Sequence, residues 1–533
     1  MQKKYEFWVD KIARKIVERE EKLNRGIKVF RTESGLGASG FPHIGSFSDV
    51  VRQYAVTLAL KDMGFESEFI AYSDDMDGLR KVPLGLPDWL EKYIGSPVSS
   101  IPDPFSCHES YARHMNSLLI EAMEKAGIEF IFQSGTENYK KGVLNEEIER
   151  ILLNSEKVGL IVKELLGQEK FVKVLPYFPV CENCGKIYTT SAYKLIPEEH
   201  KVLYVCDQEF VGKNLNTNKR VVVKGCGYEG EVNYFKGEGK LSWKGEFAAR
   251  WKALQIVFEA CGKDIHDSVK VNDRICKEVL NFEPPIHVIY EMFLEKGGKK
   301  ISKSYGNVFT PQIWLKYGSM KSLILLMLKR FKGTRELDIN DIPKYMDELD
   351  KLERIYFEKE KIENERDLIN AKRLFEYVHF LKPPKEIGLQ IPYNTLVEIA
   401  KILPQRNKLE FAIEKLKELG SLPEINEKII KELEERLKFA ENWAEMEKEE
   451  EKIEISEKEK KAVKELIKAI EEEEDGERLQ SKIFEIARTN EIRPEDFFKT
   501  LYRIIFKMER GPRLGPYMVK VKEEVIEKLK EVV

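Results

Sequence analysis

Two short segments of this chain carry residues suited to binding a triphosphate. Residues 38–46 read ASGFPHIGS, and residues 300–304 read KISKS. Glycines in the first segment would let the backbone approach a ligand, and a helix beginning after Pro42 would offer free N–H groups to phosphate. Lys300 and Lys303 could reach the same phosphates as mobile point charges. The pair therefore predicts one ATP site. Taken singly, the first segment could instead contain a helix-cap histidine at His43, and the second could be a solvated Lys/Ser loop.

The elements that would position these residues alternate between strand and helix. Strands are expected over 27–34, 66–73 and 129–133, and helices over 43–62 and 108–126. Such alternation predicts a parallel sheet covered by helices. Ligands of these sheets bind at the carboxyl ends of the strands, which is where the first glycine-containing segment would lie.

Four cysteines between the predicted sheet strands have the spacing of metal ligands. Cys181 and Cys184 form a C-x-x-C pair, and Cys206 and Cys226 follow downstream. Four thiolates supplied from short turns suit a closed tetrahedral zinc site. The alternative is a C-x-x-C pair beside two unrelated buried thiols. Cys261 and Cys276 lie away from these clusters and are interpreted as buried thiols.

A second cluster falls within one short segment, DPFSCHESYARH. It contains Asp103, Cys107, His108 and His114, all of which can bind zinc. Histidine and cysteine are both scarce in the chain, with seven of each, so abundance does not explain the clustering. The sequence therefore predicts a second zinc site. The alternative is a polar helix start capped by Asp103 and Ser106.

Length and composition limit the class of protein. A chain of 533 residues predicts two to four domains. There is no uncharged apolar run of membrane-spanning length and no secretory signal, so we expect a cytoplasmic protein with no membrane segment. Because that compartment is reducing, the cysteines are better interpreted as metal ligands or buried thiols than as disulfide partners. The net charge is −3, so binding of nucleic acid would require local concentrations of positive charge.

The two phosphate-binding segments resemble the signatures of class I aminoacyl-tRNA synthetases. Gly40, His43, Ile44 and Gly45 match the HIGH motif, with Ser46 in place of the final histidine, and Lys300, Ser302, Lys303 and Ser304 match KMSKS. Further segments narrow the resemblance to class I lysyl-tRNA synthetase. These are 73–83 (SDDMDGLRKVP), 102–111 (PDPFSCHESY), 243–251 (WKGEFAARW), 262–266 (GKDIH) and 511–516 (GPRLGP).

The resemblance implies an α/β fold. A Rossmann-type parallel-sheet nucleotide-binding domain with a zinc-binding insertion would be followed by an all-α C-terminal region that binds the anticodon. The expected divisions are an N-terminal helix over 1–23, a catalytic domain over 24–310 with its insertion at about 171–236, a connecting segment over 311–355 and the helical domain over 356–533.

The resemblance also implies the reaction. ATP and Mg²⁺ would activate L-lysine to lysyl-adenylate, and the lysyl group would pass to the 3′ end of tRNA-Lys. His43, Lys300 and Lys303 would be catalytic. The ATP-binding residues implied are Ser39, Gly40, His43, Ile44, Gly45, Ser46, Lys300, Ile301, Ser302, Lys303 and Ser304.

A pocket for lysine requires an acidic partner and an aromatic face for the ammonium group. Glu33, Asp74 and Asp75 are the acidic candidates, and the resemblance suggests Trp243 and His266 as lining. Each could instead cap a helix or fill a core. The chain departs from the family at Ile265, which precedes His266, at Val269–Lys270, and at Glu246–Phe247.

Three other functions remain open on the sequence alone. A class I synthetase for glutamate or glutamine would place a basic residue in the pocket where lysine needs acidic ones. A small-molecule nucleotidyltransferase would not need the long helical region after residue 310. A catalytically silent tRNA-binding paralogue is opposed by the intact His43, Lys300 and Lys303.

Overall fold

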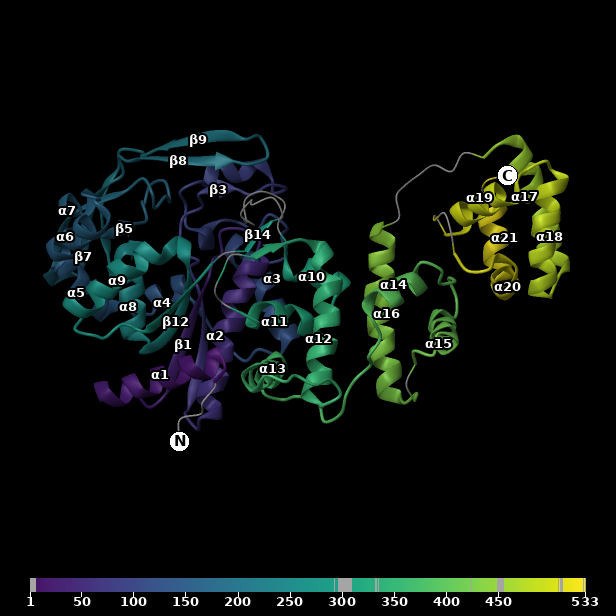
Figure 1. The fold of residues 1–533 in the computed structure, drawn as a ribbon. Coiled ribbons are helices and arrows are strands. Elements are labelled where there is room, and N and C mark those ends of the chain that lie inside the picture. The colour runs from purple at the N-terminus through teal and green to yellow at the C-terminus, as the bar shows by residue number, and fades with distance from the viewer. Residues whose placement is uncertain are drawn as a thin grey trace. The chain divides into compact units, whose positions relative to one another are not determined.

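The computed structural model describes most of the chain in two compact units. The described residues are 6–291, 293–295, 309–330, 333, 335–422, 424–447, 455–506, 508, 511–530 and 532. The first unit comprises Met1–Trp314 and Met320–Lys385, and the second comprises Leu315–Ser319 and Glu386–Val533 (Figure 1). The predicted ATP-binding residues 300–304 lie outside the described residues.

A parallel sheet forms the centre of the first unit, which confirms the predicted α/β class. Its strands run in the order β13-β12-β1-β2-β4, and every neighbouring pair is parallel. Their bounds are β1 Phe30–Leu36, β2 Ser67–Ser73, β4 Ile131–Ser134, β12 Ile256–Gly262 and β13 Ile286–Tyr290. The strand order reverses between β1 and β12, and parallel α/β sheets bind ligands at such a reversal.

Helix α2, Ile44–Asp62, connects β1 to β2 and is buried along almost its whole length. Its sequence is apolar on more than one face, as a helix enclosed by other elements requires. Helix α1, Trp8–Leu23, buries only one apolar stripe, which includes Ile12 and Ile16. Further helices of this unit are α3 Tyr111–Ala126, α8 Trp243–Ala253 and α9 His266–Glu278.

Between β4 and α8 the chain contains four α-helices and then short strands. The helices are α4 Gly135–Lys140, α5 Asn145–Leu153, α6 Ser155–Leu166 and α7 Lys170–Lys173. One antiparallel sheet contains β10 Glu229–Asn233, β7 Lys201–Val205 and β6 Ser191–Ile196. Another sheet contains β3 Lys81–Val82, β8 Glu209–Asn214 and β9 Lys219–Lys224, and β11 Gly239–Leu241 pairs with β5 Tyr177–Pro179. Strands β5 to β10 lie within the predicted insertion, whereas β3 precedes it and β11 follows it.

The first unit ends with helices that pack back onto its beginning. Strand β14, Phe293–Glu295, pairs with β15, Arg335–Leu337. Arg373 on α13 lies 2.9 Å from Asp10 of α1 and 2.6 Å from Asp62 of α2. This ion-pair network places α13 in the first unit, so the boundary between units falls after Lys385. The helices are α10 Pro311–Tyr317, α11 Met320–Leu328, α12 Ile342–Tyr356 and α13 Glu365–Val378.

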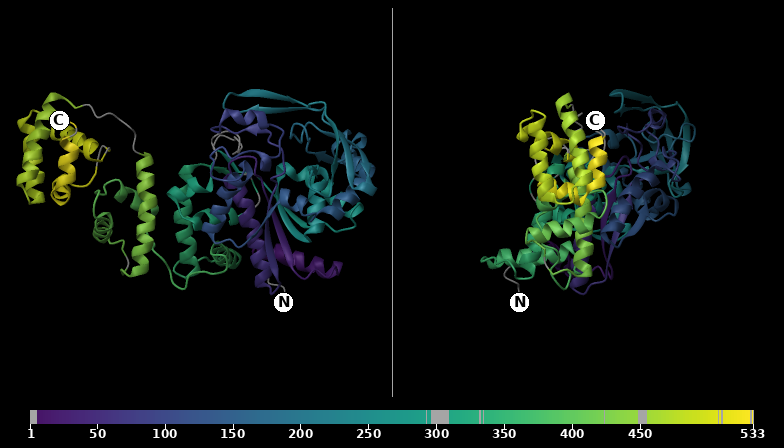
Figure 2. Two further views of the ribbon diagram at one scale, coloured as in Figure 1. Left: turned by 180° about the vertical axis from the view of Figure 1, so that it is seen from behind. Right: turned by 90° about the vertical axis from the view of Figure 1, so that its right-hand side faces the viewer.

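The described residues of the second unit contain helices and no strand. Figure 2 shows this green-to-yellow part from two further directions. Its core includes Leu466, Ile483 and Phe497. The helices are α14 Tyr393–Ala400, α15 Lys408–Glu418, α16 Glu427–Glu447, α17 Glu457–Glu472, α18 Gly476–Thr489, α19 Pro494–Phe506, α20 Leu514–Lys520 and α21 Lys522–Lys530. Among the described parts of both units, no helix is both long enough and apolar enough to cross a membrane.

Candidate active site and metal clusters

A cavity of about 240 Å³ lies where β1 and β12 end and α2 begins. We call it the active-site cavity. Of the predicted site residues, His43, Gly45, Ser46, Asp74 and Trp243 line it. Its other lining residues are Ser34, Gly35, Gly37, Asp49, Phe247, Arg250, Glu259, Ala260, Cys261, Gly262, Asp264, Ile265, Tyr290, Glu291 and Phe293. The cavity therefore occupies the ligand-binding position expected for a sheet with this strand order.

His43 is the N-cap of α2, and its imidazole helps to form the cavity wall. The ring Nδ1 accepts a hydrogen bond of 3.2 Å from the Ser46 backbone N–H. The ring proton of the neutral imidazole is therefore on Nε2. A Cβ atom at Gly45 would lie only 2.7 Å from His43 Cε1. Glycine at this position is what allows the imidazole to lie across the turn.

Ser39, Gly40 and Ile44 of the same segment are outside the lining of the cavity. Ile44 is fully buried, and its backbone N–H donates to the Phe309 carbonyl at 2.8 Å. The Ser39 carbonyl accepts a hydrogen bond from the Tyr111 hydroxyl at 3.1 Å. Gly40 is also buried, whereas Ser39 is exposed, so the three residues belong to the turn without lining the cavity.

Arg250 on α8 is buried among acidic side chains at one side of the cavity. Its guanidinium nitrogens lie 2.8 Å from Glu33 and 2.6 Å from Asp74. The guanidinium also stands over the Tyr72 ring, 4.3 Å from the centroid. Burial raises the pKa of Glu33 to about 8 and also raises the pKa of Asp74, even though Arg250 opposes both shifts. Arg250 therefore carries one positive charge beside two carboxyl groups, Glu33 and Asp74, and cannot neutralise both.

Lys240 forms a second buried ion-pair centre close to the first. It contacts Asp77 and lies 2.6 Å from Glu246. The indole N–H of Trp243 donates to the Asp77 carboxylate at 3.0 Å, which fixes the ring at the cavity wall. Burial raises the pKa of Glu246 to about 7 despite the nearby ammonium group.

Sequence reasoning missed the basic residues of both centres and Asp77. Arg250 and Asp77 lie inside the segments WKGEFAARW and SDDMDGLRKVP, which carried the family resemblance, but their pairings span far-apart parts of the chain. Arg250 is 176 positions from Asp74, and Lys240 is 163 positions from Asp77. The only possible signal was that these charged residues are buried. The sequence alone does not show this, because their partners lie far away along the chain.

The active-site cavity is acidic. Five of its lining residues carry carboxylates, whereas Arg250 is the single Arg or Lys among the described lining residues. The acidic residues are Asp49, Asp74, Glu259, Asp264 and Glu291. An excess of carboxylates over basic groups in a partly enclosed cavity favours a ligand that carries positive charge.

Three of the predicted lysine-binding residues lie outside the lining of the cavity. Glu33 is fully buried and pairs with Arg250. Asp75 accepts hydrogen bonds from the Ser134 hydroxyl at 2.5 Å and the Thr136 N–H at 2.7 Å, and so ties β2 to the end of β4. His266 begins α9, directly after Ile265, which does line the cavity.

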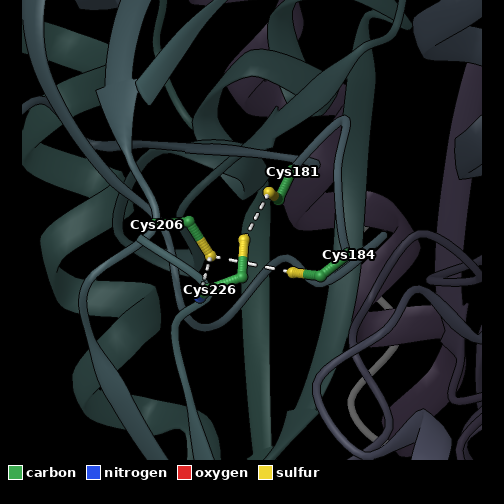
Figure 3. Close-up of side chains that lie close together, drawn as sticks. All are labelled: Cys181, Cys184, Cys206 and Cys226. Atoms are coloured by element: carbon green, nitrogen blue, oxygen red, sulfur yellow. Dashed lines mark hydrogen bonds between the residues drawn. The ribbon is translucent and has the colours of Figure 1, made fainter. Parts of the chain in front are cut away.

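The four cysteines of the insertion converge to one point (Figure 3). The Sγ atoms of Cys181 and Cys226 are 3.6 Å apart, and those of Cys184 and Cys206 are 3.7 Å apart. Both distances are too long for disulfides. Four sulfurs at about 2.3 Å from a tetrahedral zinc ion would be roughly 3.8 Å apart, so the cluster fits this metal.

The second predicted cluster also converges. Cys107 Sγ lies 3.1 Å from His108 Nδ1 and 3.2 Å from His114 Nδ1, and Asp103 lies 3.3 Å from His114. Burial of Asp103 is outweighed by hydrogen bonds from backbone N–H groups, including those of Cys107 and His108, which lower its carboxyl pKa to about 2. An ionised carboxylate, a thiol and two imidazoles form a donor set that suits zinc.

The chain matches a family described as tRNA synthetases class I (K) over residues 6–379. It is 44% identical to a lysine--tRNA ligase of Cenarchaeum symbiosum, covering 97% of each chain. It is 32% identical to a lysine--tRNA ligase of Methanocaldococcus jannaschii, covering 97% of this chain and 98% of that protein. A crystal structure of glutamate-tRNA synthetase from Elizabethkingia anophelis, 15% identical, aligns over 94% of this chain and 99% of that chain with a TM-score of 0.38, too low to support a conclusion. The chain belongs to the class I tRNA synthetase family whose members include these archaeal lysine--tRNA ligases.

Proposed function

We propose that this chain is a lysine--tRNA ligase. It activates L-lysine with ATP and transfers the lysyl group to the 3′-terminal adenosine of tRNA-Lys. One observation of the structure carries the proposal: an acidic cavity with His43 in its wall lies at the strand-order reversal of the parallel sheet. The names of relatives that match nearly the whole chain support the same assignment.

In the first step, a carboxylate oxygen of lysine attacks the α-phosphorus of ATP. A P–O bond forms to give lysyl-adenylate, and the bond to the bridging oxygen breaks to release pyrophosphate. His43 donates from Nε2 to a phosphate oxygen, because Nδ1 is occupied by the Ser46 N–H. We assign Lys300 and Lys303 to the β- and γ-phosphates. Magnesium, when bound with the triphosphate, offsets charge on its oxygens.

In the second step, a ribose hydroxyl of the terminal adenosine, in this class the 2′-hydroxyl, attacks the lysyl carbonyl carbon. The new ester bond forms as the bond to AMP breaks, and the hydroxyl proton leaves with solvent or phosphate. Positioning and charge complementarity supply most of the acceleration in such transfers.

Choice of the amino acid follows from the charge of the cavity. Asp49, Asp74 and Glu259 are among its lining carboxylates, and they attract the ammonium groups of lysine. Trp243 offers an aromatic face to the side chain, and Asp77 holds its indole in place. The carboxylate of a glutamate side chain would be repelled here. The cavity therefore favours lysine over the glutamate or glutamine alternative.

The remaining assignments complete the proposal. We assign one structural zinc ion to Cys181, Cys184, Cys206 and Cys226, and a second to Asp103, Cys107, His108 and His114, in agreement with the convergence of their ligand atoms. We assign anticodon binding to the helical region of the predicted domain 356–533, whose described residues contain no strand.

Aminoacylation of total tRNA with each labelled amino acid tests the function. We expect ATP-dependent charging with lysine alone. A Lys303→Ala variant should lower adenylate formation about 100-fold or more while still binding tRNA, because removing a transition-state donor typically costs about 10²–10³ in rate. Charging with glutamate or glutamine, or near-normal pyrophosphate exchange in the variant, would refute the assignment.

A further inference from the structure

Three carboxyl groups surround the guanidinium of Arg250 at the side of the active-site cavity. Its nitrogens lie 2.8 Å from Glu33, 2.6 Å from Asp74 and 3.8 Å from Glu259. Glu33 is fully buried, and only 12% and 10% of the Asp74 and Glu259 side chains are exposed. Burial disfavours each ionised carboxylate, and neighbouring carboxylates disfavour one another. One guanidinium cannot offset three such charges, so this arrangement favours a proton on one of the three carboxyl groups.

Hydrogen bonds indicate which carboxyl group holds the proton. Asp74 accepts a hydrogen bond of 2.6 Å from Arg250 Nη1, and Glu259 accepts one of 2.5 Å from the indole N–H of Trp251. Neither carboxyl oxygen of Glu33 has a hydrogen-bond partner among the described residues, although an Arg250 nitrogen lies 2.8 Å away. Hydrogen bonds from donors favour the ionised form of a carboxyl group, so Glu33 is the least supported as an anion. Its pKa, which burial raises to about 8, agrees with this assignment.

The groups that face Glu33 come from each element packed against β1 on this side. Strand β12 contributes Glu259, α8 contributes Arg250, and β2 contributes Tyr72, whose ring lies against the guanidinium, and the Asp74 that follows it. The next titratable groups outward are His287, Glu246, Lys240 and Asp77. Among the described residues, Arg250 is therefore the one cation in direct contact with Glu33.

The cavity connects this buried carboxyl group to the ligand. Asp74, Glu259 and Arg250 line the cavity, whereas Glu33 is outside the lining. Lysine brings more ammonium than carboxylate charge into the cavity at neutral pH. An ammonium group that pairs with Asp74 or Glu259 partly neutralises a carboxylate that competes for Arg250. The guanidinium is then available to stabilise an ionised Glu33.

We propose that Glu33 compensates the charge of bound lysine: its carboxyl group is protonated before lysine binds and ionises as an ammonium group of lysine enters the cavity. The O–H bond of the carboxyl group breaks, its electron pair stays on the oxygen, and the proton passes to a base of the buffer. The inference rests on the proposed function, because it takes lysine as the ligand. Glu33 acts through Arg250 and does not line the cavity, so it is a positioning residue.

Release of a proton makes the affinity for lysine depend on pH. For each proton released on binding, log Kd falls by about one per pH unit, which is the same linkage that governs stability. The Kd for lysine should therefore fall by up to about tenfold as the pH rises from about 6.5 to about 7.5. The fall should level off above about pH 8, where Glu33 is already ionised before lysine binds.

Isothermal titration of lysine into the parent protein tests the proposal, with tRNA-Lys present and ATP absent. Titrations at about pH 7 in two buffers with different ionisation enthalpies count the protons released. The parent should release about one proton for each lysine bound. Glu33→Gln keeps the size of the side chain but has no proton to release, so it should release close to none. Its Kd should stay nearly constant where the Kd of the parent falls.

A matched control is Glu246→Gln, which removes the other buried carboxyl group whose pKa burial raises, here to about 7. Glu246 pairs with Lys240 and is outside the cavity lining, so this variant should release a proton as the parent does. A parent that binds lysine without releasing a proton would overturn the inference, whether or not either variant folds. Parent-like release in Glu33→Gln would overturn it as well. Failure of the parent to bind lysine at all would instead overturn the proposed function.

Discussion

Arg250 is the residue on which the buried acidic side of the cavity most depends. It is fully buried and faces Glu33, Asp74 and Glu259. Removing one partner of a buried ion pair leaves uncompensated charge at a typical cost of about 3–5 kcal/mol. An Arg250→Met variant should therefore lower the free energy of unfolding by about this amount, as measured by denaturant titration.

The control for Arg250 is Arg274→Met. Arg274 pairs with Glu164 and Glu278 at the surface, with 35% of its side chain exposed. Ion pairs of this kind contribute about 0–1 kcal/mol, so the control should unfold near the parental midpoint. Equal midpoints for the two variants would show that Arg250 is not a structural centre of the cavity.

Glu33 gives the unit a specific dependence on pH. Burial raises its carboxyl pKa from 4.5 to about 8, so between these values the folded state holds a proton that the unfolded state has released. The stabilisation is fully present below about pH 4.5 and is lost as the pH rises through about 8. A Glu33→Gln variant should show a smaller decline in unfolding free energy across this window. An unchanged decline would mean that Glu33 ionises normally in the folded state.

The proposal gives His43 two separable tasks, which two substitutions distinguish. Aspartate can replace its capping role on α2, whereas alanine cannot and should cost about 1 kcal/mol. Neither aspartate nor alanine has a side-chain N–H to donate to phosphate, so both substitutions should lower ATP–pyrophosphate exchange by about 10²–10³ in the presence of tRNA. If His43→Asp were as active as the parent, capping would be the whole role of His43.

At the scale of elements, local pattern predicted the sheet well. The expected strands 66–73 and 129–133 correspond to β2 and β4, and the expected helix 43–62 to α2. The helix expected from 108 begins at Tyr111, because Ser110 caps it. Residues 103–108 instead form a turn in which the Asp103 carboxylate accepts backbone N–H groups. Alternating strands and helices are encoded locally, and so are visible in one sequence.

The convergence of the two sets of candidate metal ligands was predictable for a different reason. Their ligand types are scarce, and several ligands of each set are close in sequence, as with Cys181 and Cys184. The ion-pair centres around Lys240 and Arg250 combine common charged residues from distant segments, so nothing local distinguishes them. The fold itself decides which carboxylates are buried beside these cations.

Metal analysis tests both clusters at once. The purified protein should contain two zinc ions per chain, because both donor sets are complete. Cys184→Ser and His114→Ala should each remove one ion, whereas Cys276→Ala, a buried thiol outside both clusters, should remove none. Zinc content of zero in the parent, or two in every variant, would contradict the sites.

At the scale of the whole molecule, a small net charge conceals strong local segregation. The chain carries a formal charge of −3, yet the first unit contains both an acidic cavity and, on the β3–β8–β9 sheet, three cations in register: Lys81, Lys213 and Arg220. The acidic cavity suits a cationic amino acid. Composition averages these features away, which is why the sequence alone left the glutamate and glutamine alternatives open.

The most direct test of the central claim compares amino acids that differ in charge at the end of the side chain. Adenylate formation should be measured with lysine, norleucine and glutamate in the presence of ATP and tRNA-Lys. An acidic cavity predicts efficient activation of lysine, far weaker activation of norleucine, which lacks the ammonium group, and none of glutamate. Activation of glutamate at a rate equal to that of lysine would contradict the account.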